Sequence, residues 1–185
     1  MNASDHQSRD PAPFLVEQVL KVPLGLVLDI ACGYGRNAFF LAARKGNRVL
    51  GFDQSEAAVD FCNREAKAQN LPFTAQGIDL EKQFPSETEA AAICCFYYLD
   101  RNIIPKIKQA VKIGGVVVYE TFLIDQHQHY GKPARTAFCW EHNELLSSFL
   151  EFRILFYHEG QIFTPDDEGR MNGRWVAQLI AERRV

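Results

Sequence analysis

The chain has 185 residues, of which 47% are apolar and 23% are charged, as is ordinary for a soluble globular protein. A net charge of −3 excludes broad attraction to nucleic acid or to an anionic membrane surface, and no apolar run approaches the roughly 20 residues that span a bilayer. We therefore expect one domain over residues 1–185 and a small-molecule partner, with no nucleic acid and no membrane as partners. The oligomeric state stays open.

The cysteines bear on the compartment in which the protein works. They are odd in number and form no C-x-x-C pair, and no charged-then-apolar segment stands at the N-terminus. These features indicate reduced thiols and predict a cytoplasmic protein. The five cysteines are Cys32, Cys62, Cys94, Cys95 and Cys139.

The first part of the chain predicts a strand, a glycine turn and a helix. Residues 1–10 are polar and we expect them to be flexible, and a short helix is expected over 11–21. Residues 26–30 are mostly aliphatic, as in a strand buried on both faces. Gly33 and Gly35 then break the run, and a helical pattern follows over 37–45.

The middle of the chain alternates strands and helices. Residues 48–52 form an apolar run that ends at Asp53, and Ser55 is the expected N-cap of a helix that reaches about Asn70. Further strands are expected over 72–77, 90–96 and 116–121, with a helix over 102–112. Alternation of this kind predicts an α/β fold with right-handed crossovers and a doubly wound, mostly parallel sheet.

The pattern changes after the strand at 116–121. Residues 122–139 are polar with no clear period, so we expect a long loop near the active site. A helix is expected near 141–148, followed by strands over 150–158 and 175–183 with a turn at Glu159–Gly160. These last two strands suit an antiparallel pair.

The glycine turn and two acidic residues together describe a ligand. Glycines allow close backbone approach, and Asp53 lies 18 residues beyond Gly35, near the spacing at which dinucleotide-binding folds hold ribose hydroxyls. Asp29, near the end of the first strand, would repel a phosphate but could hold an ammonium group. A ligand with a ribose at one end and an amino acid at the other is S-adenosylmethionine.

The stretch L-D-I-A-C-G-Y-G-R-N, residues 28–37, resembles the first motif of class I S-adenosylmethionine-dependent methyltransferases. It departs from the usual x-G-x-G-x-G by having Ala31 at the first glycine, and alanine still permits a close turn. The form D-x-A-C-G-x-G-R is similar to tellurite-resistance-type small-molecule methyltransferases. The resemblance covers residues 26 to about 121. It implies a seven-stranded Rossmann-like methyltransferase sheet with an antiparallel C-terminal strand pair.

Ligands of open parallel sheets bind at the carboxyl ends of the strands, and the candidate residues lie there. Asp29 is expected to face the methionine ammonium and Asp53 the ribose. Arg36 is expected either at the methionine carboxylate or on the surface. The resemblance implies that Asp79 lies near the adenine amino group, with a helix cap or turn as the alternative. The expected cofactor-binding residues are Asp29, Ala31, Gly33, Gly35, Arg36, Asp53, Gln54, Asp79, Leu80 and Phe96.

Methyl transfer needs in-line placement of an acceptor, and a general base only where that acceptor must lose a proton. The catalytic candidates follow the fourth and fifth strands: Tyr97, Glu120, His127 and His129, with Tyr130 also considered. His127-x-His129 with His142 could bind a metal, but no carboxylate or cysteine stands at a ligand spacing, so no metal is expected.

The absence of two motifs narrows the class of methyl acceptor. No N-P-P-Y or D-P-P-Y tetrapeptide follows the fourth strand, and no Pro-Cys nucleophile stands there. A small-molecule acceptor is favoured. One alternative is a nucleotide-cofactor oxidoreductase, against which the missing third glycine and Asp29 argue. Another is a non-catalytic S-adenosylmethionine-binding module.

Overall fold

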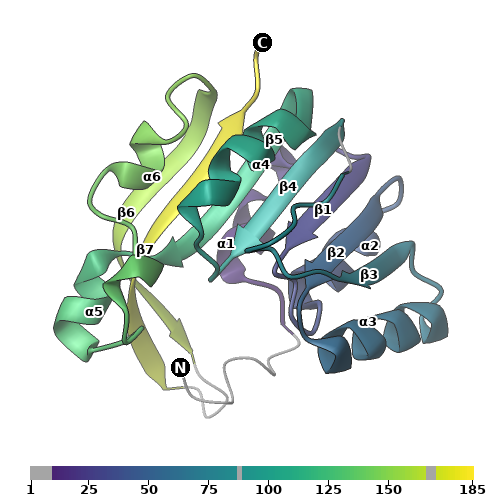
Figure 1. Ribbon diagram of the computed structural model, residues 1–185, viewed down its shortest axis with the longest axis horizontal. Helices are drawn as coiled ribbons and strands as arrows, with labels where there is room; N and C mark the ends of the chain where they lie inside the picture. Colours follow the sequence, from purple (N-terminus) through teal and green to yellow (C-terminus); the bar gives the residue numbers. More distant parts are fainter. Residues whose placement is uncertain (1–9, 87–88, 166–169) are drawn as a thin grey trace.

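The computed structural model describes residues 10–86, 89–165 and 170–185, and these form a layered α/β fold (Figure 1). The seven strands of its sheet lie in the order β3-β2-β1-β4-β5-β7-β6. The pairs among β1 to β5 are parallel, whereas β7 runs antiparallel to both β5 and β6. The predicted fold class is confirmed. The strands are β1 (Leu26–Ile30), β2 (Arg48–Asp53), β3 (Phe73–Gly77), β4 (Ala90–Phe96), β5 (Val111–Phe122), β6 (Arg153–Pro165) and β7 (Met171–Glu182).

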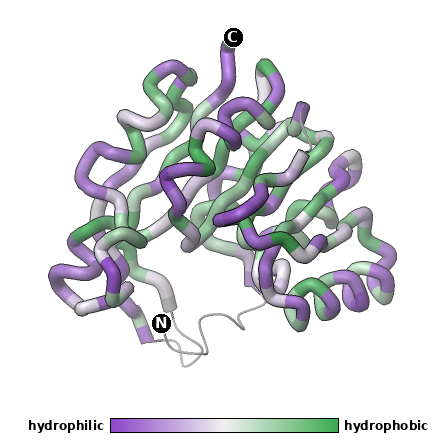
Figure 2. The backbone as a smooth tube through the Cα atoms, in the orientation of Figure 1, coloured by the Kyte–Doolittle hydropathy of each residue, from purple (hydrophilic) through white to green (hydrophobic). Residues whose placement is uncertain are grey.

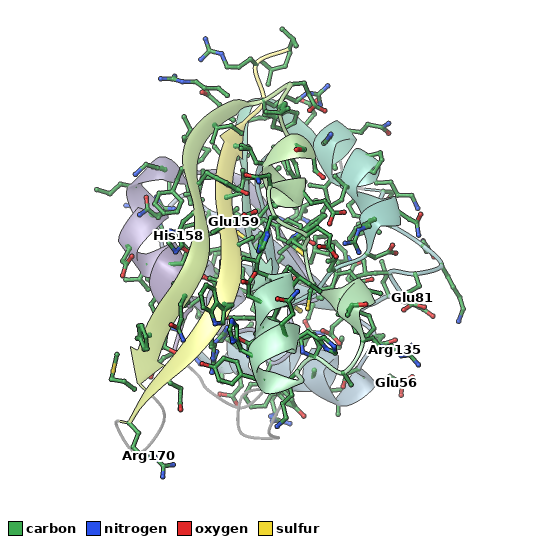
Figure 3. The ribbon with its side chains drawn as sticks, turned by 90° about the vertical axis from the view of Figure 1, so that its left-hand side faces the viewer. Glu56, Glu81, Arg135, His158, Glu159 and Arg170 are labelled. Atoms are coloured by element: carbon green, nitrogen blue, oxygen red, sulfur yellow. The ribbon has the colours of Figure 1, made fainter. Side chains whose placement is uncertain are left out.

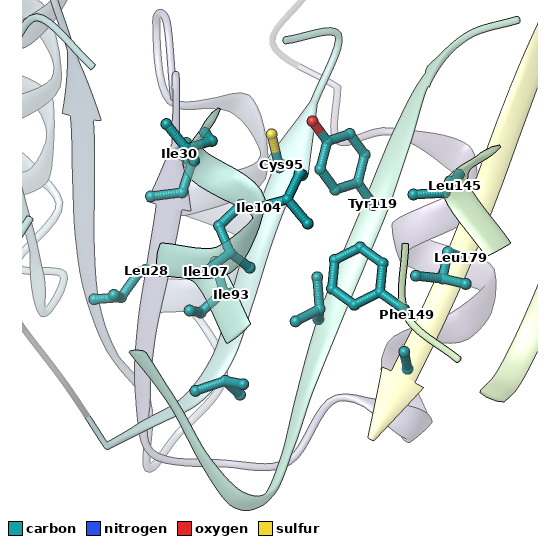
Figure 4. Close-up of a cluster of buried hydrophobic side chains, with 14 of the residues drawn as sticks. Leu28, Ile30, Ile93, Cys95, Ile104, Ile107, Tyr119, Leu145, Phe149 and Leu179 are labelled. Carbon is teal, nitrogen blue, oxygen red and sulfur yellow. The ribbon is translucent and has the colours of Figure 1, made fainter. Parts of the chain in front are cut away.

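Helices cover both faces of the sheet. On one face α1 (Pro13–Gln18), α2 (Arg36–Ala42) and α3 (Glu56–Ala68) pack on a core that includes Val27 and Val49. On the other face α4 (Ile104–Ala110) and α6 (Glu144–Ser147) pack on a core that includes Leu28 (Figure 4). The remaining helical segments are η2 (Val19–Lys21), η3 (Arg101–Ile103), α5 (Ile124–Tyr130) and η4 (Thr136–Phe138).

The alternation along β1 decides where its acidic residue points. Val27 belongs to the core on the α2 face and Leu28 to the core on the α4 face, because successive side chains of a strand point to opposite faces. Asp29 therefore faces the α2 side, at the carboxyl end of the central strand. Figure 2 shows the hydrophobic colour along the central strands and the hydrophilic colour on the outer helices.

The long loop predicted over 122–139 is wrong, because the structure has helix α5 there and the short η4 after it. Seven residues are too few to show a helical period in the sequence. The helix is held by tertiary contacts: Ile124 is buried, and the Gln126 side chain accepts a hydrogen bond from the Trp175 backbone N–H at 2.8 Å. Gly131 ends it in the left-handed conformation, at φ 64°.

The turn predicted at Glu159–Gly160 is also wrong. Both residues pair with β7, as Glu159 with Ala177 and Gly160 with Val176, so β6 continues to Pro165. Ladder hydrogen bonds outweigh the turn preference of a single glycine here. The resulting β6–β7 hairpin runs past the end of the sheet, with Arg170 near its far end (Figure 3).

The other boundaries differ by a few residues. The helices predicted at 37–45, 102–112 and 141–148 are shorter, and β5 begins at Val111 because the chain joins the sheet at once after α4. The predicted N-cap is confirmed, since the Ser55 side chain accepts from the Ala58 N–H at 3.3 Å. The flexibility predicted for 1–10 concerns mostly residues outside the described ones. Among the described residues, no helix is long and apolar enough to cross a bilayer.

Candidate active site

The glycine turn between β1 and α2 is a tight loop fixed by backbone geometry. Ala31, Gly33 and Gly35 all have positive φ, at 56°, 53° and 80°. A Cβ on Gly35 would stand 2.9 Å from the Cys62 sulfur, so this position requires glycine for space as well as for conformation. The turn lies at the carboxyl end of β1, where open parallel sheets bind their ligands.

Asp53 joins the turn to the end of β2. Its Oδ2 accepts from the Gly33 N–H at 2.8 Å, and its Oδ1 accepts from the Ser55 N–H at 2.9 Å. Each carboxylate oxygen has a second lone pair, so Asp53 keeps acceptor capacity for hydroxyl groups. The residue lines the pocket described below, as the ribose assignment requires.

Asp29 lies beneath the turn and is 2% exposed. Its Oδ2 has no hydrogen-bond partner among the described residues. Burial raises the pKa of this carboxyl to about 7, with a further upward contribution from Asp53 and a downward one from Arg36. An unpartnered, buried carboxylate oxygen at a pocket wall fits a cationic ligand group.

A pocket of about 210 Å³ joins the turn to the ends of β4, β5 and β7. Of the expected cofactor-binding residues, it brings together Asp29, Ala31, Gly33, Arg36, Asp53 and Phe96. Tyr97, a predicted catalytic candidate, lines the pocket too, and sequence reasoning missed the other lining residues. These residues are Cys32, Tyr34, Asn37, Tyr98, Phe122 and Arg174.

Arg174 is the most informative of the missed residues. It lies on β7, before the predicted start of that strand at 175, and its guanidinium carbon is 5.8 Å from the centre of the Tyr97 ring. Arg36 lies 5.7 Å from the same ring centre. In the sequence, the signal for Arg174 was the alternation along β7, which puts Arg174 on the same face as Gln178. In the structure, the register of β7 against β5 places Gln178 opposite Glu120.

Tyr97 lines the pocket and is partly buried, and its side chain is hydrogen-bonded to the buried Glu120. Tyr97 follows β4 with φ 54°, and its backbone N–H donates to the Glu120 carbonyl at 2.8 Å. The Glu120 carboxylate is 2% exposed and accepts from Gln178 Nε2 at 2.6 Å. Burial raises the pKa of Glu120, and the hydrogen bond with the Tyr97 hydroxyl lowers it in part. Burial, followed by the charge of Glu120, raises the pKa of Tyr97.

Four predicted cofactor residues lie outside the lining of this pocket. Asp79 makes an ion pair with Lys82 at 2.7 Å, and its Oδ1 accepts from the Glu81 N–H, so it holds a turn. The Lys82 hydrogen bond lowers its pKa. Leu80 is buried in the core and Gln54 is exposed. Gly35 is outside the lining as well, and its positive φ sets the conformation of the turn.

The histidine candidates lie around α5, outside the described lining of the pocket. His127 Nδ1 is 2.8 Å from the Pro133 carbonyl, and His129 stacks on Trp175 with ring centres 5.2 Å apart. His142 Nε2 is 2.5 Å from Asp125 Oδ2, and Tyr130 is within 3.1 Å of Gln161 Nε2. Over residues 10–86, 89–165 and 170–185, no three metal-ligating side chains form a group that could hold a metal ion.

Comparisons with known proteins define the class to which this site corresponds. Residues 27–115 match the family model of a methyltransferase domain. The matched segment runs from β1 into β5 and contains the glycine turn, Asp29 and Asp53. In this segment and in its sheet order, the chain is similar to class I S-adenosylmethionine-dependent methyltransferases.

The curated relatives sharpen the comparison to one kind of methyltransferase. The chain is 25% identical over 167 residues to the probable S-adenosyl-L-methionine-dependent methyltransferase TehB of Haemophilus influenzae. The match covers 85% of this chain and 57% of TehB, so the chain spans little more than half the length of that relative. The predicted resemblance to tellurite-resistance-type methyltransferases is confirmed.

Solved structures agree on the fold. The crystal structure of TehB from Haemophilus influenzae superposes with a TM-score of 0.77 at 23% identity, covering 94% of this chain and 62% of that one. Geranyl diphosphate C-methyltransferase from Streptomyces coelicolor A3(2) superposes with a TM-score of 0.68 at 18% identity, covering 92% and 78%. That enzyme was solved with Mg²⁺, geranyl diphosphate and S-adenosyl-L-homocysteine.

Proposed function

We propose that this protein transfers a methyl group from S-adenosylmethionine to a small-molecule acceptor, in the cytoplasm. The observation that carries the proposal is one pocket with two unlike walls. One wall holds the glycine turn with Asp29 and Asp53, and the other holds Tyr97 and Arg174. A cofactor and an acceptor can therefore meet in the same space.

The first wall fits the cofactor by its own chemistry. Asp29 has a buried oxygen with no partner among the described residues, which suits an ammonium group, and Asp53 has free acceptor capacity for ribose hydroxyls. Arg36 lines the same pocket and suits the methionine carboxylate. When bound, the cofactor supplies a methyl group on a sulfonium, and the thioether that remains is a good leaving group. The protein therefore chiefly has to align the acceptor.

The second wall would orient that acceptor. The Tyr97 ring lines the pocket, and Glu120 behind it can take up a proton, since burial holds its pKa above the ordinary value. We assign the base role to this unit rather than to His127 and His129, which bond to Pro133 and stack on Trp175. The negative net charge supports a small acceptor over a nucleic acid. The five unpaired, buried cysteines support a reducing compartment.

The test is calorimetric titration with S-adenosylmethionine, S-adenosylhomocysteine and NAD, followed by transfer of a labelled methyl group to a panel of small thiols, phenols, amines and carboxylic acids. We expect micromolar binding of the first two ligands, none of NAD, and labelling of one acceptor class. Binding of NAD alone would favour an oxidoreductase. Cofactor binding without labelling of any acceptor would favour a non-catalytic binding module.

A further inference from the structure

The charge state of Asp29 depends on its buried position in the sheet. It pairs in register with Gly51 of β2 and with Cys94 of β4, so it lies at the centre of the sheet. Its side chain is 2% exposed and points to the α2 face, at the wall of the pocket. Its Oδ2 has no partner among the described residues. The charge of Arg36 and a hydrogen bond from the Ala38 backbone favour the negative form, but burial disfavours it more strongly in the protein without cofactor.

The charged groups around Asp29 come from each element that packs on it. Arg36 of α2 is a favourable partner, whereas Asp53 of β2 repels a second negative charge. The neighbouring thiols stay neutral: burial raises the pKa of Cys94 and Cys95 on β4, and the hydrogen bond with Cys62 followed by burial raises that of Cys32. The charge of Arg36 is therefore opposed by the burial of Asp29 and by the charge of Asp53, and burial is the largest of the three influences, so the Asp29 carboxyl gives up its charge.

We propose that Asp29 holds a proton in the protein without cofactor and releases it to solvent when the methionine ammonium enters, so that cofactor binding is coupled to proton release. This inference rests on the proposed function, because it takes the cofactor as the ligand. The balance is simple: the neutral carboxyl becomes a carboxylate, the carboxylate pairs with the ammonium, and one proton passes to the buffer. Asp29 thereby makes cofactor affinity depend on pH near neutrality.

The pH window follows from the raised pKa of about 7. At pH 6 about one-tenth of the Asp29 carboxyls would be ionised, and at pH 7.5 about three-quarters. Affinity for S-adenosylhomocysteine should therefore rise about eightfold between these values. The ligand's α-amino group stands beside a free carboxylate, which raises its pKa above the about 7.7–8.0 of a chain terminus, so it stays an ammonium across this range.

The experiment is titration of the whole protein with S-adenosylhomocysteine at pH 6 in phosphate and in imidazole, whose ionisation enthalpies differ. We expect release of about 0.9 proton per ligand bound, falling as pH rises. Methylthioadenosine, which has the nucleoside but no amino-acid group, is the matched ligand. It should bind without net proton release and without the pH dependence.

Two variants locate the proton. Asp29→Asn keeps the shape of the side chain but cannot ionise, so its affinity for S-adenosylhomocysteine should be low and independent of pH, with methylthioadenosine unaffected. Asp60→Asn, at an exposed position on α3, should behave as the unmodified protein. Proton release that persists in Asp29→Asn, or that also accompanies methylthioadenosine, would overturn the assignment to Asp29.

Failure of the coupling and failure of the function give different results. Tight S-adenosylhomocysteine binding with the same affinity at pH 6 and 7.5 and no proton release would overturn the coupling and leave the proposed function standing. No binding of either ligand by folded protein would overturn both.

Thermal melting gives a reading without any ligand. The pKa of about 7 exceeds the ordinary 3.8, so between about pH 4 and pH 7 the folded chain binds more protons than the unfolded chain. Stability from this group is therefore present at low pH and lost as pH rises through 7. Asp29→Asn should melt higher than the unmodified protein at pH 8, and the difference should fall to about half at pH 5.5 and close near pH 4. A constant difference would overturn the proposal.

Discussion

The two walls of the pocket are built in different ways. The wall formed by β1, the glycine turn and β2 comes from residues 26–55, a single strand–helix–strand unit, within which Gly33 bonds to Asp53. The other wall takes Tyr97 from β4, Glu120 from β5 and Arg174 and Gln178 from β7. Its side chains meet only when the sheet is complete.

This difference suits a cofactor of constant structure on one side and an acceptor on the other. The first wall holds the Asp53 carboxylate through backbone N–H donors of the turn and of the residues after β2, whose positions depend on the pairing of β1 with β2. The second wall depends on side chains from three strands, so a substitution there can change the acceptor without disturbing the turn. We expect variants to separate cofactor binding from acceptor recognition along this line.

The largest effect is expected at Asp53. Replacing it in Asp53→Ala removes the acceptor of both the Gly33 and Ser55 N–H groups as well as the ribose contact. Calorimetry should show at least a tenfold loss of S-adenosylhomocysteine affinity, or about 1.5–3 kcal/mol. Asp60→Ala on the exposed side of α3 is the control. Unchanged affinity in Asp53→Ala would contradict the ribose assignment.

A paired comparison of the two arginines tests the division between the walls. Both lie near the Tyr97 ring, at 5.7 and 5.8 Å, so their environments are closely matched. Arg36→Met should weaken S-adenosylhomocysteine binding about tenfold through loss of a charged hydrogen bond, and Arg174→Met should change it less than about twofold. Methylthioadenosine should bind both variants equally. Equal losses of S-adenosylhomocysteine binding would mean that the cofactor reaches both walls.

The smallest effect is expected outside the pocket, at the ion pair between His142 and Asp125. The hydrogen bond with Asp125 raises the pKa of His142, so its stabilisation is full at low pH and is lost as pH rises through that raised value. With the His142 side chain 58% exposed, solvent screening keeps the contribution below about 0.5 kcal/mol. Melting of His142→Gln should be about 1–2 °C lower at pH 5.5 and unchanged at pH 9. A changed cofactor affinity would show that α5 influences the pocket.

Much of the first wall could be predicted from the chain. The buried strand before the turn, the acidic residue at its end and the second acid 18 residues beyond Gly35 are local patterns, and each corresponds to a contact in the structure. The same holds for Ser55, whose capping role depends on residues three positions away. These patterns were readable because the cap joins residues three positions apart and the two acids belong to one strand–helix–strand unit with a known spacing.

The sequence by itself therefore determined the α/β class, the glycine turn and the two carboxylates that line the pocket, Asp29 and Asp53. The tertiary structure alone decided that β6 runs through Glu159–Gly160, because strand pairing with β7 outweighs a turn preference. It also decided that α5 forms, since seven residues with no clear period are held by packing against β7. Finally, it brought Arg174 to Tyr97 across 77 residues of chain, a contact that depends on the register of β7 against β5 and leaves no local signal.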